Sequence, residues 1–213
     1  MSRTAACKFS DLRRGDSVGF SPVDLTGAAI SLGTYPPWPF SSRFCHFGMV
    51  AGFDGYSALY ESTIDAGLGD CLHAKKIVAG VQVHGVLPRL MIHGARGGRA
   101  WRLPLLRTSR EVWDLATDNE WEWPYRSLLG TGYDPWGALS ARFLLGGWRK
   151  WLRERKPEAG AKSLLFCSEF VLLAYQKLGL LPQSVASEKY NPKAAARLLV
   201  KRGICGPPEE IVL

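Results

Sequence analysis

The chain has 213 residues, of which 46% are hydrophobic and 22% charged, so its composition is typical of a globular protein and excludes a disordered one. The length predicts a single domain over residues 1–213, and the lack of any uninterrupted apolar run of about 18 residues excludes a membrane span. Lys and Arg number 27 against 19 Asp and Glu, which gives a net charge of +8 and favours anionic partners.

The thiols and the amino terminus indicate a compartment. Five cysteines, an odd number without the spacing of a disulfide framework, are typical of reduced intracellular thiols. The residues that follow Met1 contain no apolar core of signal-peptide length. We therefore expect a cytoplasmic protein.

The predicted strands lie mainly in the first half of the chain. Apolar or alternating runs predict strands at 17–20, 47–53, 56–63, 75–78, 82–86 and 99–105, with a short helix over 87–93. The segment 23–42, rich in proline and aromatic residues, is longer than a simple link between strands, and we expect it to form part of a substrate rim. Residues 64–125 indicate no particular chemistry.

The second half is predominantly helical. Helices are expected over 109–122, 135–154, 167–178 and 192–202. Ser109 is the predicted N-cap of the first, Gly179 ends the third, and Asn191-Pro192 opens the last. Strands clustered before helices indicate an α+β fold, with a strand-rich part over 1–107 and a helical part over 108–213.

A β-hairpin is the clearest local prediction. Asp54-Gly55 lies between two strand-like runs and is the strongest short-range hairpin signal. With these two residues as the loop, Gly48 lies opposite Glu61, and His46 lies on the same face as Glu61. The two side chains are then diagonal neighbours, about 7 to 8 Å apart at the backbone and within reach of one another. A register shifted by one residue would place them on opposite faces.

Cys167 is the candidate nucleophile. It lies at the start of the helix predicted over 167–178, where the positive end of the helix dipole favours the thiolate that attacks a carbonyl carbon. His46 is the candidate base, and Glu61 would orient its ring and stabilise its charged form. Glu169 is a rival acid, but two residues beyond the cysteine on a helix it points away from the thiol. Spacing alone does not bring Cys167 to the hairpin.

Taken in order, these residues resemble the circularly permuted papain-like, NlpC-type cysteine peptidases of the YiiX-like group. The lecithin:retinol acyltransferase-like proteins are related to this group. The similar stretches are 12–20, 45–50, 59–62 and 166–171. The resemblance implies a permuted papain-like fold, in which a small antiparallel β-barrel or sheet carries the histidine and packs against helices that carry the cysteine.

The same resemblance implies roles for individual residues. It implies Cys167 as nucleophile, His46 as base and Glu61 as the orienting acid. Tyr133 is similar to a tyrosine that helps to hold the oxyanion in some members, and a packing or turn role is its alternative. No metal or organic cofactor is implied.

The expected chemistry is hydrolysis of an amide bond through an acyl-thioester on Cys167. The substrate would be a small-molecule or peptide amide, such as a cell-wall peptide. One alternative is acyl transfer or thioester cleavage on lipid or acyl substrates, which shares the same acyl-enzyme. Another is a non-catalytic module that binds a polyanion through a basic surface.

Two basic clusters are candidates for contact with an anionic surface such as wall polymer or phospholipid. They comprise Arg89, Arg96, Arg99, Arg102 and Arg107, and Arg149, Lys150, Arg153, Arg155 and Lys156. A solvated helix face is the alternative for the second cluster, and no specific nucleic-acid motif accompanies either.

A zinc site is a weaker alternative. Four possible soft ligands are Cys45, His46, Cys71 and His73. Adjacent residues on a strand point to opposite faces and no Cys-x-x-Cys pair occurs, so the spacing of structural zinc is absent. His84 and His93 have no acidic or thiol neighbours that suggest a site, and we interpret both as bystanders.

Overall fold

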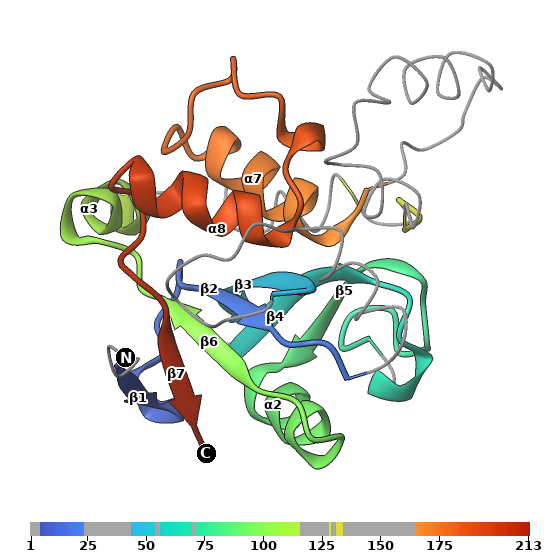
Figure 1. Cartoon of the computed structure of the whole chain (residues 1–213). Helices are drawn as coiled ribbons and strands as arrows, with labels where there is room; N and C mark the ends of the chain where they lie inside the picture. Colours follow the sequence, from blue (N-terminus) through green and yellow to red (C-terminus); the bar gives the residue numbers. More distant parts are fainter. Residues whose placement is uncertain are drawn as a thin grey trace, which may run out of the picture.

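Seven strands form one sheet in the order β1-β7-β6-β2-β3-β4-β5 (Figure 1). The computed structural model describes residues 5–23, 44–53, 56–69, 71–115, 128, 131–133 and 165–213. The strands are β1 (Ala6–Lys8), β2 (Ser17–Phe20), β3 (His46–Phe53), β4 (Tyr56–Thr63), β5 (Gly80–Gly85), β6 (Ala100–Leu103) and β7 (Glu209–Val212). β1 and β7 run parallel and the other described pairs antiparallel. The fold is therefore α+β, and over the described residues its sheet is mixed and is not closed into the barrel that was one of the two expected forms.

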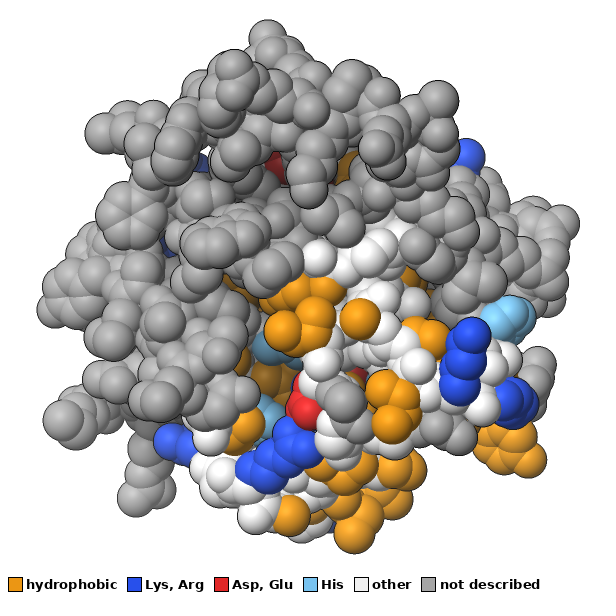
Figure 2. All heavy atoms as spheres, turned by 90° about the vertical axis from the view of Figure 1, so that its right-hand side faces the viewer, with side chains coloured by type: hydrophobic (Ala, Val, Ile, Leu, Met, Phe, Trp, Pro, Cys, Tyr) orange, Lys and Arg blue, Asp and Glu red, His pale blue; other side chains and the backbone are white. Residues whose placement is uncertain are grey.

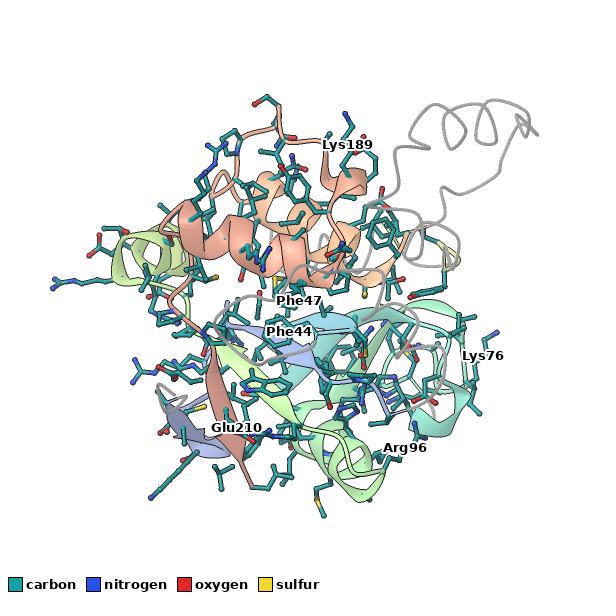
Figure 3. The ribbon with its side chains drawn as sticks, viewed as in Figure 1. Phe44, Phe47, Lys76, Arg96, Lys189 and Glu210 are labelled. Carbon is teal, nitrogen blue, oxygen red and sulfur yellow. The ribbon has the colours of Figure 1, made fainter. Side chains whose placement is uncertain are left out.

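Helices cover both faces of this sheet. The described helices are α2 (Val86–Ala95), α3 (Arg107–Leu115), α7 (Cys167–Lys177) and α8 (Pro192–Lys201), with single 3-10 turns at Phe9–Asp11, Ala66–Leu68 and Ser187–Lys189. In Figure 1, α7 and α8 lie on one side of the sheet and α2 on the other. Phe44 and Phe47, both fully buried, lie between the sheet and the α7–α8 layer (Figure 3). A smaller core, which includes Leu59 and Leu90, fills the side that α2 covers.

The predicted hairpin register is confirmed. β3 and β4 pair with Phe53 opposite Tyr56 and Gly48 opposite Glu61. The strands predicted at 17–20, 47–53 and 56–63 are present, and those at 82–86 and 99–105 correspond to the shifted β5 and the shorter β6.

The strand predicted at 75–78 is wrong. The Lys75 amide donates to the Cys71 carbonyl at 2.9 Å, and Lys75 has a positive φ of 51°. Both are features of a turn, because extended backbone has negative φ and bonds to a neighbouring strand.

The helix boundaries follow local signals with one exception. Gly179 has φ of 73° just beyond α7, and Asn191 Oδ1 accepts from the Ala194 amide at 2.9 Å at the start of α8, as predicted. The Ser109 N-cap is wrong, because the Arg110 amide already donates to the Leu106 carbonyl and the helix begins at Arg107. The helix predicted over 135–154 and the expected rim residues 24–42 lie outside the described residues.

The chain ends in a strand that the sequence did not indicate. β7 inserts between β1 and β6, with Glu210 opposite Trp101 and Glu209 opposite Arg102. Glu210 pairs with the Arg99 guanidinium and Glu209 with that of Arg102. These cross-strand ion pairs explain how two adjacent glutamates fit a strand, although acidic residues are unfavourable there on average.

Candidate active site

His46 and Glu61 are in direct contact on the β3–β4 hairpin. His46 Nε2 lies 2.5 Å from Glu61 Oε2, so the two side chains share one face as the register predicts. Glu61 has no exposed surface, and the His46 side chain is 13% exposed. A Cβ at Gly48, the residue paired with Glu61, would come within 3.2 Å of the Tyr60 carbonyl. This position therefore favours glycine.

The second oxygen of Glu61 is held by Arg89, which the sequence places only in a basic cluster. Arg89 Nε donates to Glu61 Oε1 at 2.8 Å, and the Arg89 side chain is 5% exposed. Burial raises the pKa of Glu61, but the charge of Arg89, the hydrogen bond and charge of His46, and the Arg89 hydrogen bond together hold it well below its usual value. Glu61 is therefore a carboxylate at neutral pH.

Cys167 is the first residue of α7, as predicted, and its side chain is fully buried. Two hydrogen bonds fix this helix start. Ser62 Oγ on β4 donates to the Leu165 carbonyl at 2.9 Å, and Ser168 Oγ donates to the Tyr190 carbonyl at 2.8 Å. The N-cap residue, Phe166, has no side-chain oxygen that could accept from the first turn. The positive end of the helix is thus directed at the cysteine.

The structure brings His46 and Cys167 together, which spacing alone could not predict. Burial lowers the pKa of His46, but the negative charge of the Cys167 sulfur, a hydrogen bond with it, and the Glu61 bond and charge raise this pKa to about 9. Since Nε2 is bonded to Glu61, Nδ1 is the ring nitrogen left for the sulfur. The arrangement is a cysteine whose sulfur influences the histidine, with a carboxylate bonded to that histidine.

Tyr133 lies next to the strand-to-helix junction that carries the cysteine. It forms an isolated parallel bridge with Leu165, and the Leu165 amide donates to the Gly132 carbonyl at 3.0 Å. Its side chain packs with Cys45 and Phe166. This places Tyr133 beside Phe166, the residue before Cys167, and its part in catalysis stays a prediction.

The Cys167 sulfur is not exposed at the surface, and the His46 side chain is mostly buried. Figure 2 shows histidine side chains set back between hydrophobic side chains on one face of the molecule. Because Cys167 has no exposed surface, an acyl group can reach its sulfur only when a neighbouring group moves aside.

The basic cluster at 89–107 is not a free cationic surface. All five arginines are in ion pairs: Arg89 with Glu61, Arg96 with Asp65, Arg99 with Glu210, Arg102 with Asp16 and Glu209, and Arg107 with Glu111. Their charges are locally balanced, so this cluster gives little support to an anion-binding surface. The second cluster, at 149–156, lies outside the described residues.

The four possible zinc ligands do not gather into a metal site in the part of the chain that the structure describes. Cys71 accepts from the Val83 amide at 3.4 Å, and His73 lies against the Phe53 ring. Over the described ranges, no three His, Cys, Asp or Glu side chains gather where they could hold a metal ion. In the same residues no helix combines the length and apolar character needed to cross a bilayer.

His93, interpreted as a bystander, lies close to the site. Its ring contacts Phe20, with ring centroids 5.0 Å apart, and Phe20 in turn lies 5.6 Å from the His46 ring. Burial and the charge of Arg89 lower the pKa of His93 to about 4. His84 bonds to Gln82 Oε1 at 2.7 Å.

No protein-family model matches this chain, and no curated protein sequence matches it either.

Proposed function

We propose that the chain is a cysteine hydrolase that cleaves an amide bond through an acyl-thioester on Cys167. The observation that carries the proposal is one linked set of contacts: His46 is bonded to the Glu61 carboxylate and interacts with the Cys167 sulfur. A nucleophile, a base and a group that orients the base are what acyl transfer to sulfur requires.

The reaction has two halves, acylation of Cys167 and hydrolysis of the thioester. The Cys167 sulfur, having given its proton to His46, attacks the acyl carbon, and the C–S bond forms as the carbonyl becomes an oxyanion. His46 passes the proton to the leaving nitrogen, the C–N bond breaks, and the amine departs. Water, deprotonated by His46, then attacks the thioester, releasing the acid and restoring the thiol proton. Glu61 stabilises the imidazolium in both halves.

The oxyanion would be held at the start of α7. The backbone amides of the first turn have no acceptor within the helix, and the N-cap side chain of Phe166 supplies none. The Cys167 amide therefore can donate to the developing charge, and Tyr133 is the proposed second donor.

The proposed fold is the permuted papain-like arrangement. Its support is the chain order, with His46 and Glu61 on one hairpin and Cys167 far downstream at the start of a helix that packs on the same sheet. Cytoplasmic location and a peptide or small amide substrate belong to the same proposal.

The test is hydrolysis of a panel of peptide amides and acyl anilides by single variants. Cys167→Ala and His46→Ala should each lower turnover by at least about three orders of magnitude while the fold is retained. Cys7→Ala is the matched control, because Cys7 is a buried thiol whose pKa is raised by burial to about 11. Undiminished turnover in Cys167→Ala would exclude the mechanism. An acyl adduct that is released only by an added amine would show transfer instead of hydrolysis.

A further inference from the structure

A buried arginine lies behind the His46–Glu61 pair. The buried residues of α2 are Val86, Arg89, Leu90 and His93, spaced as one face of a helix. This face contacts β4 and β5. Arg89 is thereby directed at the sheet, which is an unusual place for an arginine without a specific partner.

Arg89 makes two contacts that both lead to His46. Its Nε bonds to Glu61 Oε1 at 2.8 Å, and the other oxygen of that carboxylate bonds to His46. Its guanidinium lies 4.3 Å from the Phe20 ring centroid, a cation–π distance. Phe20 is paired with His46 across β2 and β3. The histidine is therefore bordered by a carboxylate and a ring that Arg89 both contacts.

We infer that Arg89 is a positioning residue for the proposed triad: by holding Oε1 of Glu61, it keeps Oε2 directed at His46 Nε2. The inference rests on the proposed function. The terminal torsion of glutamate has a broad range, so a bond on one oxygen leaves the carboxylate free to rotate. Glu61 is fully buried, so Oε1 would be left without its donor if Arg89 were removed, and Arg89 fixes the carboxylate from the side opposite His46.

Charge balance gives Arg89 a second effect. Arg89, Glu61 and His46 form a buried row in which the carboxylate lies between two basic partners. Burial raises the pKa of Glu61, and the charge of Arg89 lowers it, so without Arg89 this pKa rises. A protonated Glu61 no longer stabilises the charged form of His46, which the proposed mechanism requires.

Other charged groups near the row do not replace Arg89. His84 on β5 and His93 on α2 both have a lowered pKa, chiefly because of burial, so they are neutral at neutral pH. Asp65, beyond the end of β4, is paired with Arg96 at 2.5 Å. Glu169, in the first turn of α7, is also buried, but as an acid it cannot supply the positive charge of Arg89.

The experiment follows the pH profile of Cys167 modification by methyl methanethiosulfonate, with the labelled peptide quantified by mass spectrometry. The variants are Arg89→Met and Arg89→Lys, with Arg99→Met as a control that loses an exposed arginine–glutamate pair. In Arg89→Met the acid limb should move up by about one pH unit or more. In Arg89→Lys, which keeps the charge, and in Arg99→Met it should stay at the wild-type pH. Circular dichroism establishes folding, and Arg89→Gln replaces Arg89→Met if that variant does not fold.

A purely structural arginine predicts a different result. A folded Arg89→Met or Arg89→Gln protein whose acid limb stays at the wild-type pH would overturn the inference. The pH profile of Cys167 modification needs no substrate, so it tests the role of Arg89 separately from the proposed hydrolysis. If the acid limb of this profile shifts but the protein hydrolyses none of the tested amides, Arg89 positions the carboxylate as inferred and the proposed function is wrong.

Discussion

Replacement of Glu61 by glutamine removes the carboxylate that both His46 and Arg89 contact. The pKa of His46 stands at about 9 against an ordinary value of 6.5, a difference worth about 3 kcal/mol. Burial opposes this rise, while Cys167 and Glu61 together produce it. In Glu61→Gln the contribution of Glu61 is lost, so the pKa of His46 should fall by at least about one unit.

The same variant should be less stable. Glu61 and Arg89 are almost fully buried, and removal of the anion leaves the guanidinium without a counter-charge at a cost of about 3 kcal/mol. Turnover should also fall, because the imidazolium loses its carboxylate.

Two measurements test this. NMR titration of the histidine rings gives the pKa of His46, assigned with His46→Asn, and urea unfolding gives the stability. Glu210→Gln is the matched control, since its partner Arg99 is 59% exposed and such pairs contribute under about 1 kcal/mol. A pKa of His46 that stays near 9 in Glu61→Gln, with stability like that of the control, would refute the reasoning.

Hydrolysis should fall as the pH rises through about 9, because His46 then loses the proton it gives to the leaving group; a rate that keeps rising beyond pH 10 in a kcat profile would contradict this. His93 has a pKa of about 4 in the folded protein, below the ordinary value of 6.5, so the unfolded chain binds the proton first as the pH falls. The free energy of unfolding therefore falls by up to about 3 kcal/mol between about pH 6.5 and about pH 4. His93→Phe should reduce that acid loss in urea unfolding at the two pH values, and an equal loss in both proteins would reject it. Tyr175→Phe removes a buried hydroxyl that donates to the Gly15 carbonyl and bonds to Ser17 Oγ. This variant should lower the free energy of unfolding by about 1 to 3 kcal/mol and leave the modification of Cys167 unchanged. A change in stability below the error of the unfolding measurement would contradict this prediction.

The hairpin part of the site could be predicted from sequence because its geometry is local. Asp54-Gly55 sets the register, and alternation then places His46 and Glu61 on one face, as observed. The start of α7 at Cys167 was also predictable, since an apolar run changes to helical periodicity there.

The rest depends on contacts between distant segments. Arg89 reaches Glu61 only because α2 packs on β4, and no local pattern encodes which helix covers which strand. The interaction of Cys167 with His46 likewise requires α7 to pack on the sheet, through bonds such as Ser62 to Leu165. An arginine between the apolar residues of a predicted helix was the one sequence signal available, and it indicates an acidic partner without naming it.

In the proposed reaction the Cys167 sulfur forms the acyl bond with the help of His46. The most direct measurement is peptide mapping by mass spectrometry after brief reaction with a labelled electrophilic acyl probe at neutral pH. We expect the label on Cys167 alone, strongly reduced in His46→Ala and unchanged in Cys7→Ala. Label on another residue, or equal labelling of Cys167 with and without His46, would contradict the account.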